Sequence, residues 1–249
     1  KLNSCGLKTS LLIMQPGEQN KTLATVEKLY EGALDAGVNR DTLIISIGGG
    51  VVGDVAGYLA ATLLRGLDVV HVPTTVLAQV DSSIGGKTGV NLSRGKNLVG
   101  AFHSPKAVFM DIDLLSTLPV DERRSGLAEA VKHGAIADIE LLNYMEDNHV
   151  ALNHGDLDDM YEVIKRATRV KAQVVAEDYL ENGKRAILNF GHTLGHALEA
   201  YDDFGGLRHG EAVALGMGFA ARLSQAQSGL SSAASQQLSR TLESLELST

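Results

Sequence analysis

A run of β-branched residues that leads directly into a cluster of glycines is the feature that most limits the fold of this 249-residue chain. Residues 42–47 read as a buried strand, and Gly48, Gly50 and Gly53 follow with G-x-G-x-x-G spacing at the start of a helix expected to run to about Leu64. Backbone N–H groups at a helix N-terminus carry partial positive charge, and glycine lets a diphosphate come close. The pattern predicts an α/β unit. Alone, it is as typical of a structural turn as of a dinucleotide site.

Hydrophobic periodicity divides the chain into two parts. Residues 10–116 alternate strand-like runs, at 11–14, 42–47, 69–72 and 108–112, with helical stretches such as 22–36. Helical spacing dominates later, at 124–145, 157–176, 193–201 and 211–227, and the Ser-rich end from residue 228 reads as a weak helix or a tail. We therefore expect a Rossmann-like α/β domain at 1–118 and an all-helical domain at 119–249.

Charge and composition exclude several classes of protein. The net charge is -8 and no basic run is interleaved with aromatic residues, so nucleic-acid binding has little support. No apolar run approaches the roughly 20 residues that span a bilayer. The single cysteine, Cys5, cannot form an internal disulfide, which favours a reducing, cytoplasmic location.

Basic residues nevertheless gather beside the Gly-rich and His-rich motifs. The residues concerned are Lys87, Lys96, Lys132, Lys171 and Arg185. Such residues are usually solvated surface groups, but together they would suit a small anionic ligand.

Three histidines and an acid indicate a metal site. His192 and His196 lie four residues apart, so both can face a common ion from one side of a helix, and His209 and Glu129 also lie next to glycines or small residues. A mixed set of imidazole and carboxylate ligands suits zinc or a similar divalent cation. Spacing alone favours His192 and His196 as the ligand pair.

Five motifs together resemble the 3-dehydroquinate synthases. They are PGEQNK at 16–21, GGGVVGD at 48–54, PTTVLAQVDSSIGGKT at 73–88, GKN at 95–97 and NFGHTLGHA at 189–197. The resemblance extends from about residue 15 to residue 220. It implies a Rossmann-like N-terminal domain followed by a helical metal-binding domain. Relative to this family, the chain begins after an N-terminal strand and helix unit and ends before the final helices.

The resemblance also implies residue roles. Cofactor-binding residues for NAD would be Glu18, Lys21, Gly49, Gly50, Val51, Asp54, Thr74, Thr75, Asp81, Lys87, Lys96 and Thr117. A zinc or cobalt ion would be held by Glu129, His192 and His209, which makes His196 a group that faces substrate or relays protons. Substrate would be surrounded by Asp81, Lys87, Asn97, Lys132, Lys171, Arg185, Asn189 and His196, with Arg65 reaching the phosphate pocket of a neighbouring subunit in a homodimer.

The implied activity is that of a lyase of the shikimate pathway. It would convert 3-deoxy-D-arabino-heptulosonate 7-phosphate to 3-dehydroquinate and phosphate, with NAD reduced and reoxidised within one turnover. Alternatives are another sugar-phosphate cyclase, a metal-dependent polyol dehydrogenase, or a folded remnant without turnover. Net production of NADH would favour the dehydrogenase, and product analysis would separate the cyclases.

Overall fold

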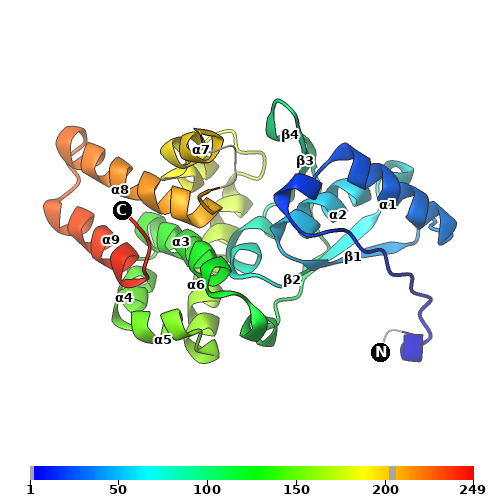
Figure 1. The fold of residues 1–249 in the computed structure, drawn as a ribbon, viewed down its shortest axis with the longest axis horizontal. Helices are drawn as coiled ribbons and strands as arrows, with labels where there is room; N and C mark the ends of the chain where they lie inside the picture. Colours follow the sequence, from blue (N-terminus) through cyan, green and yellow to red (C-terminus); the bar gives the residue numbers. More distant parts are fainter. Residues whose placement is uncertain (1–2, 202–205) are drawn as a thin grey trace. The chain divides into compact units, whose positions relative to one another are not determined.

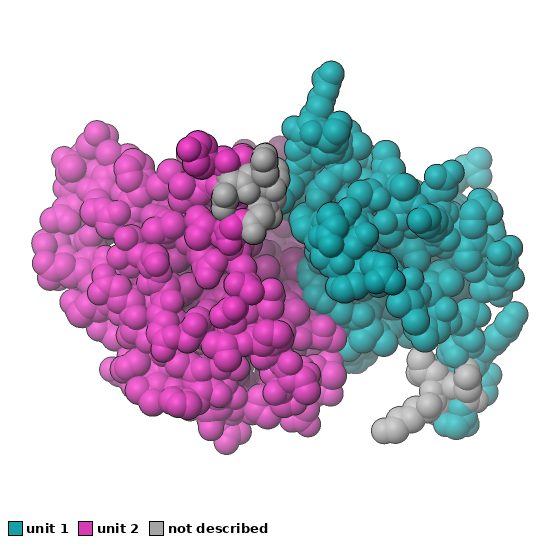
Figure 2. Space-filling model, in the orientation of Figure 1, with its two compact units in different colours: residues 1–72, 86–109 teal, residues 73–85, 110–249 magenta. Residues whose placement is uncertain are grey.

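The computed structural model describes residues 3–201 and 206–249 (Figure 1). The chain forms two compact units, one of residues 1–72 and 86–109 and the other of residues 73–85 and 110–249 (Figure 2). These units differ from the predicted division at residue 118, because 73–85 and 110–118 pack with the helices. Val76, Val80 and Leu115 are among the side chains that join these segments to the helical core.

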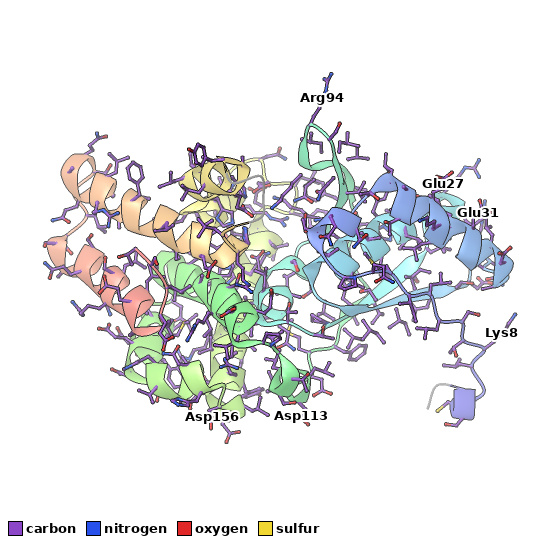
Figure 3. All side chains as sticks on the ribbon, in the orientation of Figure 1. Lys8, Glu27, Glu31, Arg94, Asp113 and Asp156 are labelled. Atoms are coloured by element: carbon purple, nitrogen blue, oxygen red, sulfur yellow. The ribbon has the colours of Figure 1, made fainter. Side chains whose placement is uncertain are left out.

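The first unit contains the α/β part of the chain. Its elements are η1 (Asn3–Cys5), η2 (Glu18–Asn20), α1 (Leu23–Asp35), β1 (Leu43–Gly48), α2 (Gly50–Thr62), η3 (Leu63–Arg65), β2 (Asp68–Pro73), β3 (Lys87–Leu92), β4 (Gly95–Phe102) and β5 (Ala107–Val108). The sheet order is β1-β2-β5, and β2 and β5 are parallel, with Val70 opposite Ala107. Strands β3 and β4 form a separate antiparallel hairpin, with Arg94 at its tip (Figure 3).

Helices α1 and α2 cover one face of the three-stranded sheet (Figure 1). Ile44 of β1 packs on that side against Leu59 and Ala33, whereas Glu27 and Glu31 point outward from α1 (Figure 3). The alternate residues of β1 are left exposed within the described part of the chain: Leu43, Ile45 and Ile47.

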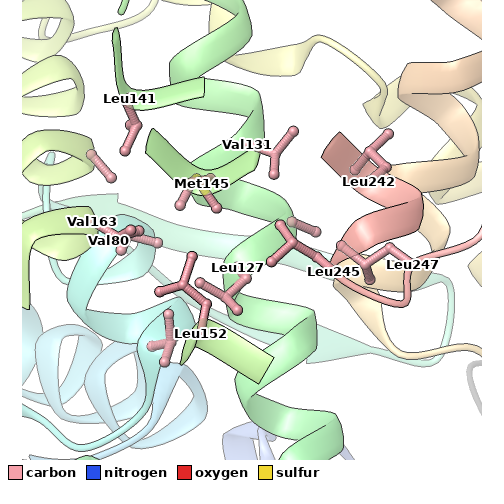
Figure 4. Close-up of a cluster of buried hydrophobic side chains, with 14 of the residues drawn as sticks. Val80, Leu127, Val131, Leu141, Met145, Leu152, Val163, Leu242, Leu245 and Leu247 are labelled. Atoms are coloured by element: carbon pink, nitrogen blue, oxygen red, sulfur yellow. The ribbon is translucent and has the colours of Figure 1, made fainter. Parts of the chain in front are cut away.

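The second unit is helical. Its elements are η4 (Ala78–Ser82), η5 (Ile112–Thr117), α3 (Val120–Ala137), α4 (Ile139–Asp147), α5 (His149–His154), α6 (Leu157–Glu177), η6 (Lys184–Asn189), α7 (His192–Tyr201), α8 (His209–Gln227) and α9 (Ser232–Ser244). Polar caps start α4, α6 and α9, because the side chains of Asp138, Asp156 and Ser231 accept hydrogen bonds from first-turn N–H groups. Apolar side chains of α3, α4, α6, α8 and α9 contribute to the core of the unit, part of which is drawn in Figure 4.

Most predicted elements are confirmed, but the strand predicted at 108–112 is only the short β5, and η5 begins at Ile112. The two-part fold class and the elements α1, β1, α2, β2, α6, α7 and α8 match their predictions. Residues 11–14 are not a strand, since no strand pairs with them among the described residues. The helix expected at 124–145 is two helices, because Asp138 leaves helical geometry and caps α4. The Ser-rich end contains the regular helix α9.

No helix within residues 3–201 and 206–249 combines the length and the apolar character needed to cross a membrane.

Candidate metal centre and anion-binding residues

Three helices of the second unit bring one carboxylate and two imidazoles together. Glu129 lies in the middle of α3, and His192 and His209 are the first residues of α7 and α8. Nε2 of His209 is 3.3 Å from Oε1 of Glu129, and Nε2 of His192 is 3.5 Å from the same oxygen. Residues far apart in the sequence therefore share one point in space.

Close backbone contacts at glycines set these positions. A Cβ atom at Gly210 would lie 2.0 Å from the carbonyl oxygen of Ser125, and the Gly210 N–H donates a 3.0 Å hydrogen bond to the Ser125 hydroxyl. A Cβ atom at Gly216 would lie 1.8 Å from the carbonyl oxygen of Gly191. Helix α8 can thus pack closely on α3 and on the start of α7, which brings His209 toward Glu129.

Glu129 is a fully buried carboxylate in a positive environment. Burial by itself would raise its pKa, but the nearby charge of Lys132, together with His209 and His192, holds the pKa well below the usual range. Lys132 forms an ion pair with Oε2 of Glu129, yet neither carboxylate oxygen accepts a well-directed hydrogen bond among the described residues. The carboxylate is therefore ionised and retains acceptor capacity.

The two histidines respond differently to this environment. Burial lowers the pKa of His192. Burial also disfavours the charged form of His209, but contacts with the carboxylates of Glu129 and Glu199 outweigh it and raise the pKa to about 10. The site accordingly favours a positive charge between the carboxylate and the imidazoles.

This donor set fits a divalent cation. The ligand atoms of Glu129, His192 and His209 lie within 4.8 Å of one another. Tetrahedral zinc, with bonds of about 2.0–2.1 Å, separates its ligand atoms by about 3.4 Å. The 3.3 and 3.5 Å separations agree with that spacing. One carboxylate and two imidazoles are a common set for catalytic zinc, which leaves positions open for substrate, and a bound cation would take the place of the extra proton on His209.

A second layer of charge surrounds Glu129. Lys171 Nζ donates to the carboxylate and to the carbonyl oxygen of Asp81, both at 2.6 Å, and Lys132 Nζ is 3.8 Å from the Asp81 carboxylate. Burial would raise the pKa of Asp81, but Lys171 and Lys132 hold it far below its usual range. His133 is buried beside them, and burial with the charge of Lys132 lowers its pKa to about 3.

Three further predicted substrate residues also lie in the second unit. Arg185 is buried, and its guanidinium donates to the carbonyl oxygens of Gly85 and Tyr179. Asn189 is exposed at the end of η6. His196 is exposed one turn beyond His192, with its ring centroid 5.2 Å away, and it is not in the ligand set of Glu129.

Several predicted cofactor residues cluster in the first unit. Lys21 is buried and forms an ion pair with Asp54 of α2, and its Nζ is 4.0 Å from Glu18. Asn91 of β3 donates a 2.8 Å hydrogen bond to Glu18 and accepts one of 2.9 Å from the Asn97 N–H. The motifs at 16–21 and 95–97 therefore meet through Asn91, and the motif at 48–54 joins them through the Lys21–Asp54 ion pair.

The glycine loop fits an anionic group. Gly49 is the N-cap of α2 and no side chain caps this helix, so the first-turn N–H groups at Gly50 and Val51 have no side-chain acceptor. Among the described residues, the first turn contains no acidic side chain. A phosphate at this position would be favoured by the helix dipole.

The remaining predicted residues are distributed over both units. Lys87 begins β3, Lys96 lies in β4, and Arg65 is exposed in a turn where its φ angle is 71°, an uncommon value for a non-glycine residue. Thr74, Thr75 and Thr117 belong to the second unit, where Thr75 accepts a hydrogen bond from the N–H of Ala78.

Sequence reasoning missed Glu199, His133 and Asn91. Glu199 could have been found, because it lies seven residues after His192 and three after His196, on the same face of α7. His133 and Asn91 carry no comparable spacing signal.

Comparisons with known proteins agree with this geometry. The family model for the 3-dehydroquinate synthase N-terminal domain matches residues 11–125, and that for the C-terminal domain matches residues 126–249. The 3-dehydroquinate synthase of Pelotomaculum thermopropionicum is 49% identical over 225 residues, which are 90% of this chain and 61% of that protein. The chain thus spans about three fifths of this relative's length.

Two solved structures share the fold. A 2-deoxy-scyllo-inosose synthase, solved with carbaglucose-6-phosphate, NAD+ and Co2+, is 38% identical with a TM-score of 0.88, over 94% of this chain and 64% of the other. The 2-epi-5-epi-valiolone synthase of Streptomyces hygroscopicus, solved with NAD+ and Zn2+, is 27% identical with a TM-score of 0.93, over 99% of this chain and 69% of the other. With both family models matched in order along the sequence, the chain belongs to the 3-dehydroquinate synthase family.

Proposed function

We propose that this chain is the catalytic part of a 3-dehydroquinate synthase, which forms 3-dehydroquinate and phosphate from 3-deoxy-D-arabino-heptulosonate 7-phosphate. The observation that carries the proposal is the meeting of Glu129, His192 and His209 beside the buried lysines 132 and 171. A site with one cation and fixed positive side chains suits a hydroxylated substrate that carries a carboxylate and a phosphate.

When bound, the divalent cation would polarise a substrate hydroxyl, and NAD would accept and later return a hydride. Glu129, His192 and His209 would hold the cation, and the residues at 18, 21, 49–51, 54, 74, 75, 81, 87, 96 and 117 would bind NAD. We assign residues 1–118 to NAD binding and residues 119–249 to metal and substrate, although 73–85 and 110–118 pack with the helical unit.

The charged side chains of the second unit would hold the substrate's anionic groups. Lys171 is kept in place by two contacts with Asp81, and Arg185 by backbone carbonyl groups, so little side-chain entropy remains to be lost on binding. The proposed substrate set also includes Asp81, Lys87, Asn97, Lys132 and Asn189. His196 is exposed and lies next to His192, where it could move a proton to or from substrate.

The active protein would be a cytoplasmic homodimer in which Arg65 reaches the partner's phosphate pocket. The exposed turn that holds Arg65 at positive φ supports this role, because strained backbone is often retained for function. The free, exposed thiol of Cys5 agrees with a reducing compartment.

The direct test is turnover by this chain with the seven-carbon sugar-acid phosphate, NAD and Zn2+. Phosphate and a cyclic product should appear in equal amounts without net NADH. Steady NADH production from a simple alcohol would instead identify a polyol dehydrogenase. Turnover of a different sugar phosphate, with this substrate inert, would identify another cyclase.

A further inference from the structure

Helix α7 carries a buried carboxylate next to the candidate metal centre that the proposed chemistry does not use. Glu199 is 4% exposed and belongs to the same helix face as His192 and His196. Its Oε2 is 3.5 Å from Nδ1 of His209. A buried carboxylate is costly to maintain without a polar partner, so this contact requires an explanation.

The two ring nitrogens of His209 face two different acids. Nε2 is 3.3 Å from Glu129, and Nδ1 is 3.5 Å from Glu199. A neutral imidazole has one N–H and one lone pair. If Nε2 is to offer its lone pair to a cation, the proton must be on Nδ1, where an ionised carboxylate can only accept it.

His192 shows the same arrangement with a different acceptor. Its Nδ1 is 3.2 Å from the carbonyl oxygen of Phe190, and its Nε2 is 3.5 Å from Glu129. Both histidines therefore present Nε2 to the centre and Nδ1 to an acceptor. The carboxylate of Glu199 differs from the carbonyl group of Phe190, because a negative charge at Nδ1 also makes the imidazole a stronger ligand through Nε2.

We propose that Glu199 is a positioning residue, which holds the proton of His209 on Nδ1 and thereby strengthens the bond from Nε2 to the cation. The inference rests on the metal centre of the proposed function. Glu199, His196 and His209 could also form a second ligand set, since their ligand atoms lie within 4.8 Å of one another. If each set held a cation, both ring nitrogens of His209 would be ligands, and the ring would have to lose both protons. His196, a member of the second set, is also exposed. We therefore favour a single cation, held by Glu129, His192 and His209.

The test compares metal binding by the parent chain, Glu199→Gln and the control Glu140→Gln, which removes a charge from an exposed position of α4. Each metal-free protein is checked by circular dichroism and titrated with Zn2+ against a chelator. Glu199→Gln should bind one Zn2+ about 10- to 100-fold more weakly than the parent, and Glu140→Gln should match the parent. Equal affinity in Glu199→Gln would overturn the inference.

A second measurement needs no variant at residue 199. Nitrogen-15 NMR of histidine-labelled parent protein with Zn2+ should place the His209 proton on Nδ1, with the resonance assigned through His209→Asn. A proton on Nε2, or two Zn2+ per parent chain with one lost in Glu199→Gln, would contradict the positioning role. A parent chain that binds no Zn2+ would instead refute the metal centre itself.

Discussion

His133 is a buried histidine that no proposed catalytic step uses. It is 0% exposed, and neither ring nitrogen has a hydrogen-bond partner among the described residues. Burial is the main cause of its pKa of about 3, and the charge of Lys132 adds to it, although Asp81 and Glu129 act in the opposite direction. The ring is therefore neutral in the folded protein at pH 5–7.

We expect this histidine to make stability depend on pH. An unfolded chain takes up a proton near the ordinary histidine pKa of about 6.5, whereas the folded chain does not. The contribution of the neutral His133 ring to the free energy of unfolding is complete above pH 6.5. It is lost as the pH falls from 6.5 toward 3, because only the unfolded chain takes up the proton. Between pH 7 and pH 5, His133 should lower the free energy of unfolding by up to about 2 kcal/mol.

Urea unfolding of metal-free parent protein and His133→Gln at both pH values measures this effect. The variant should show a smaller loss between pH 7 and pH 5, whatever its absolute stability, and the exposed His154→Gln serves as control. An equal loss in the parent and in His133→Gln would contradict the account.

At the residue scale, the sequence located the ligands only through the family resemblance. Helical spacing alone pairs His192 with His196, since it describes neighbours within one helix. The contact between His192 and His209 depends on how α7 packs against α8, which no local pattern encodes. Glu199 was missed although its spacing on α7 was available.

At the scale of elements, the start of α8 depends on a glycine pressed against α3. A methyl group at Gly210 would lie 2.0 Å from the Ser125 carbonyl oxygen, which is backbone and cannot rotate away. Helix α8 would have to shift, and His209, the preceding residue, would shift with it.

Gly210→Ala should therefore weaken Zn2+ binding at least 10-fold and destabilise the fold by about 1–3 kcal/mol, the usual cost of overpacking. Gly53→Ala is the control, because a Cβ atom there meets nothing within 4 Å and Gly53 lies in helix α2 of the first unit. Zn2+ titration and urea unfolding measure both effects. Parent-like Zn2+ affinity in Gly210→Ala would show that this contact does not set the position of His209.

Long amphipathic elements were predictable and short or polar ones were not. Helix α6 has a regular apolar stripe and an Asp156 cap, and both signals are visible in the sequence. The β3–β4 hairpin was not predicted, since KTGVNL and GKNLVGAF alternate weakly and contain several glycines. Residues 11–14 have strand composition, but pairing with a neighbour decides whether a strand forms.

At the scale of the whole molecule, the two units have separate cores, and the candidate metal centre lies wholly in the second. The sequence predicted an α/β part and a helical part, but not the transfer of residues 73–85 to the helical unit. That transfer depends on Val76 and Val80 packing into the helical core, which is a tertiary effect.

This separation predicts where Zn2+ should act. At a free concentration 100 times its dissociation constant, a ligand stabilises the folded state by about 2.7 kcal/mol. Hydrogen exchange should slow in α3 and at the starts of α7 and α8, and stay unchanged in α1 and α2. Equal slowing in α1 and α2 would mean that Zn2+ binds elsewhere or stabilises both units together.

The central claim is that Glu129, His192 and His209 hold one divalent cation. The most direct measurement is Zn2+ stoichiometry in the parent chain, Glu129→Gln, His192→Ala, His209→Ala and His196→Ala, each confirmed as folded. We predict one Zn2+ per chain in the parent and in His196→Ala, and none in the other three. Zn2+ retained by His209→Ala, or lost from His196→Ala, would contradict the account.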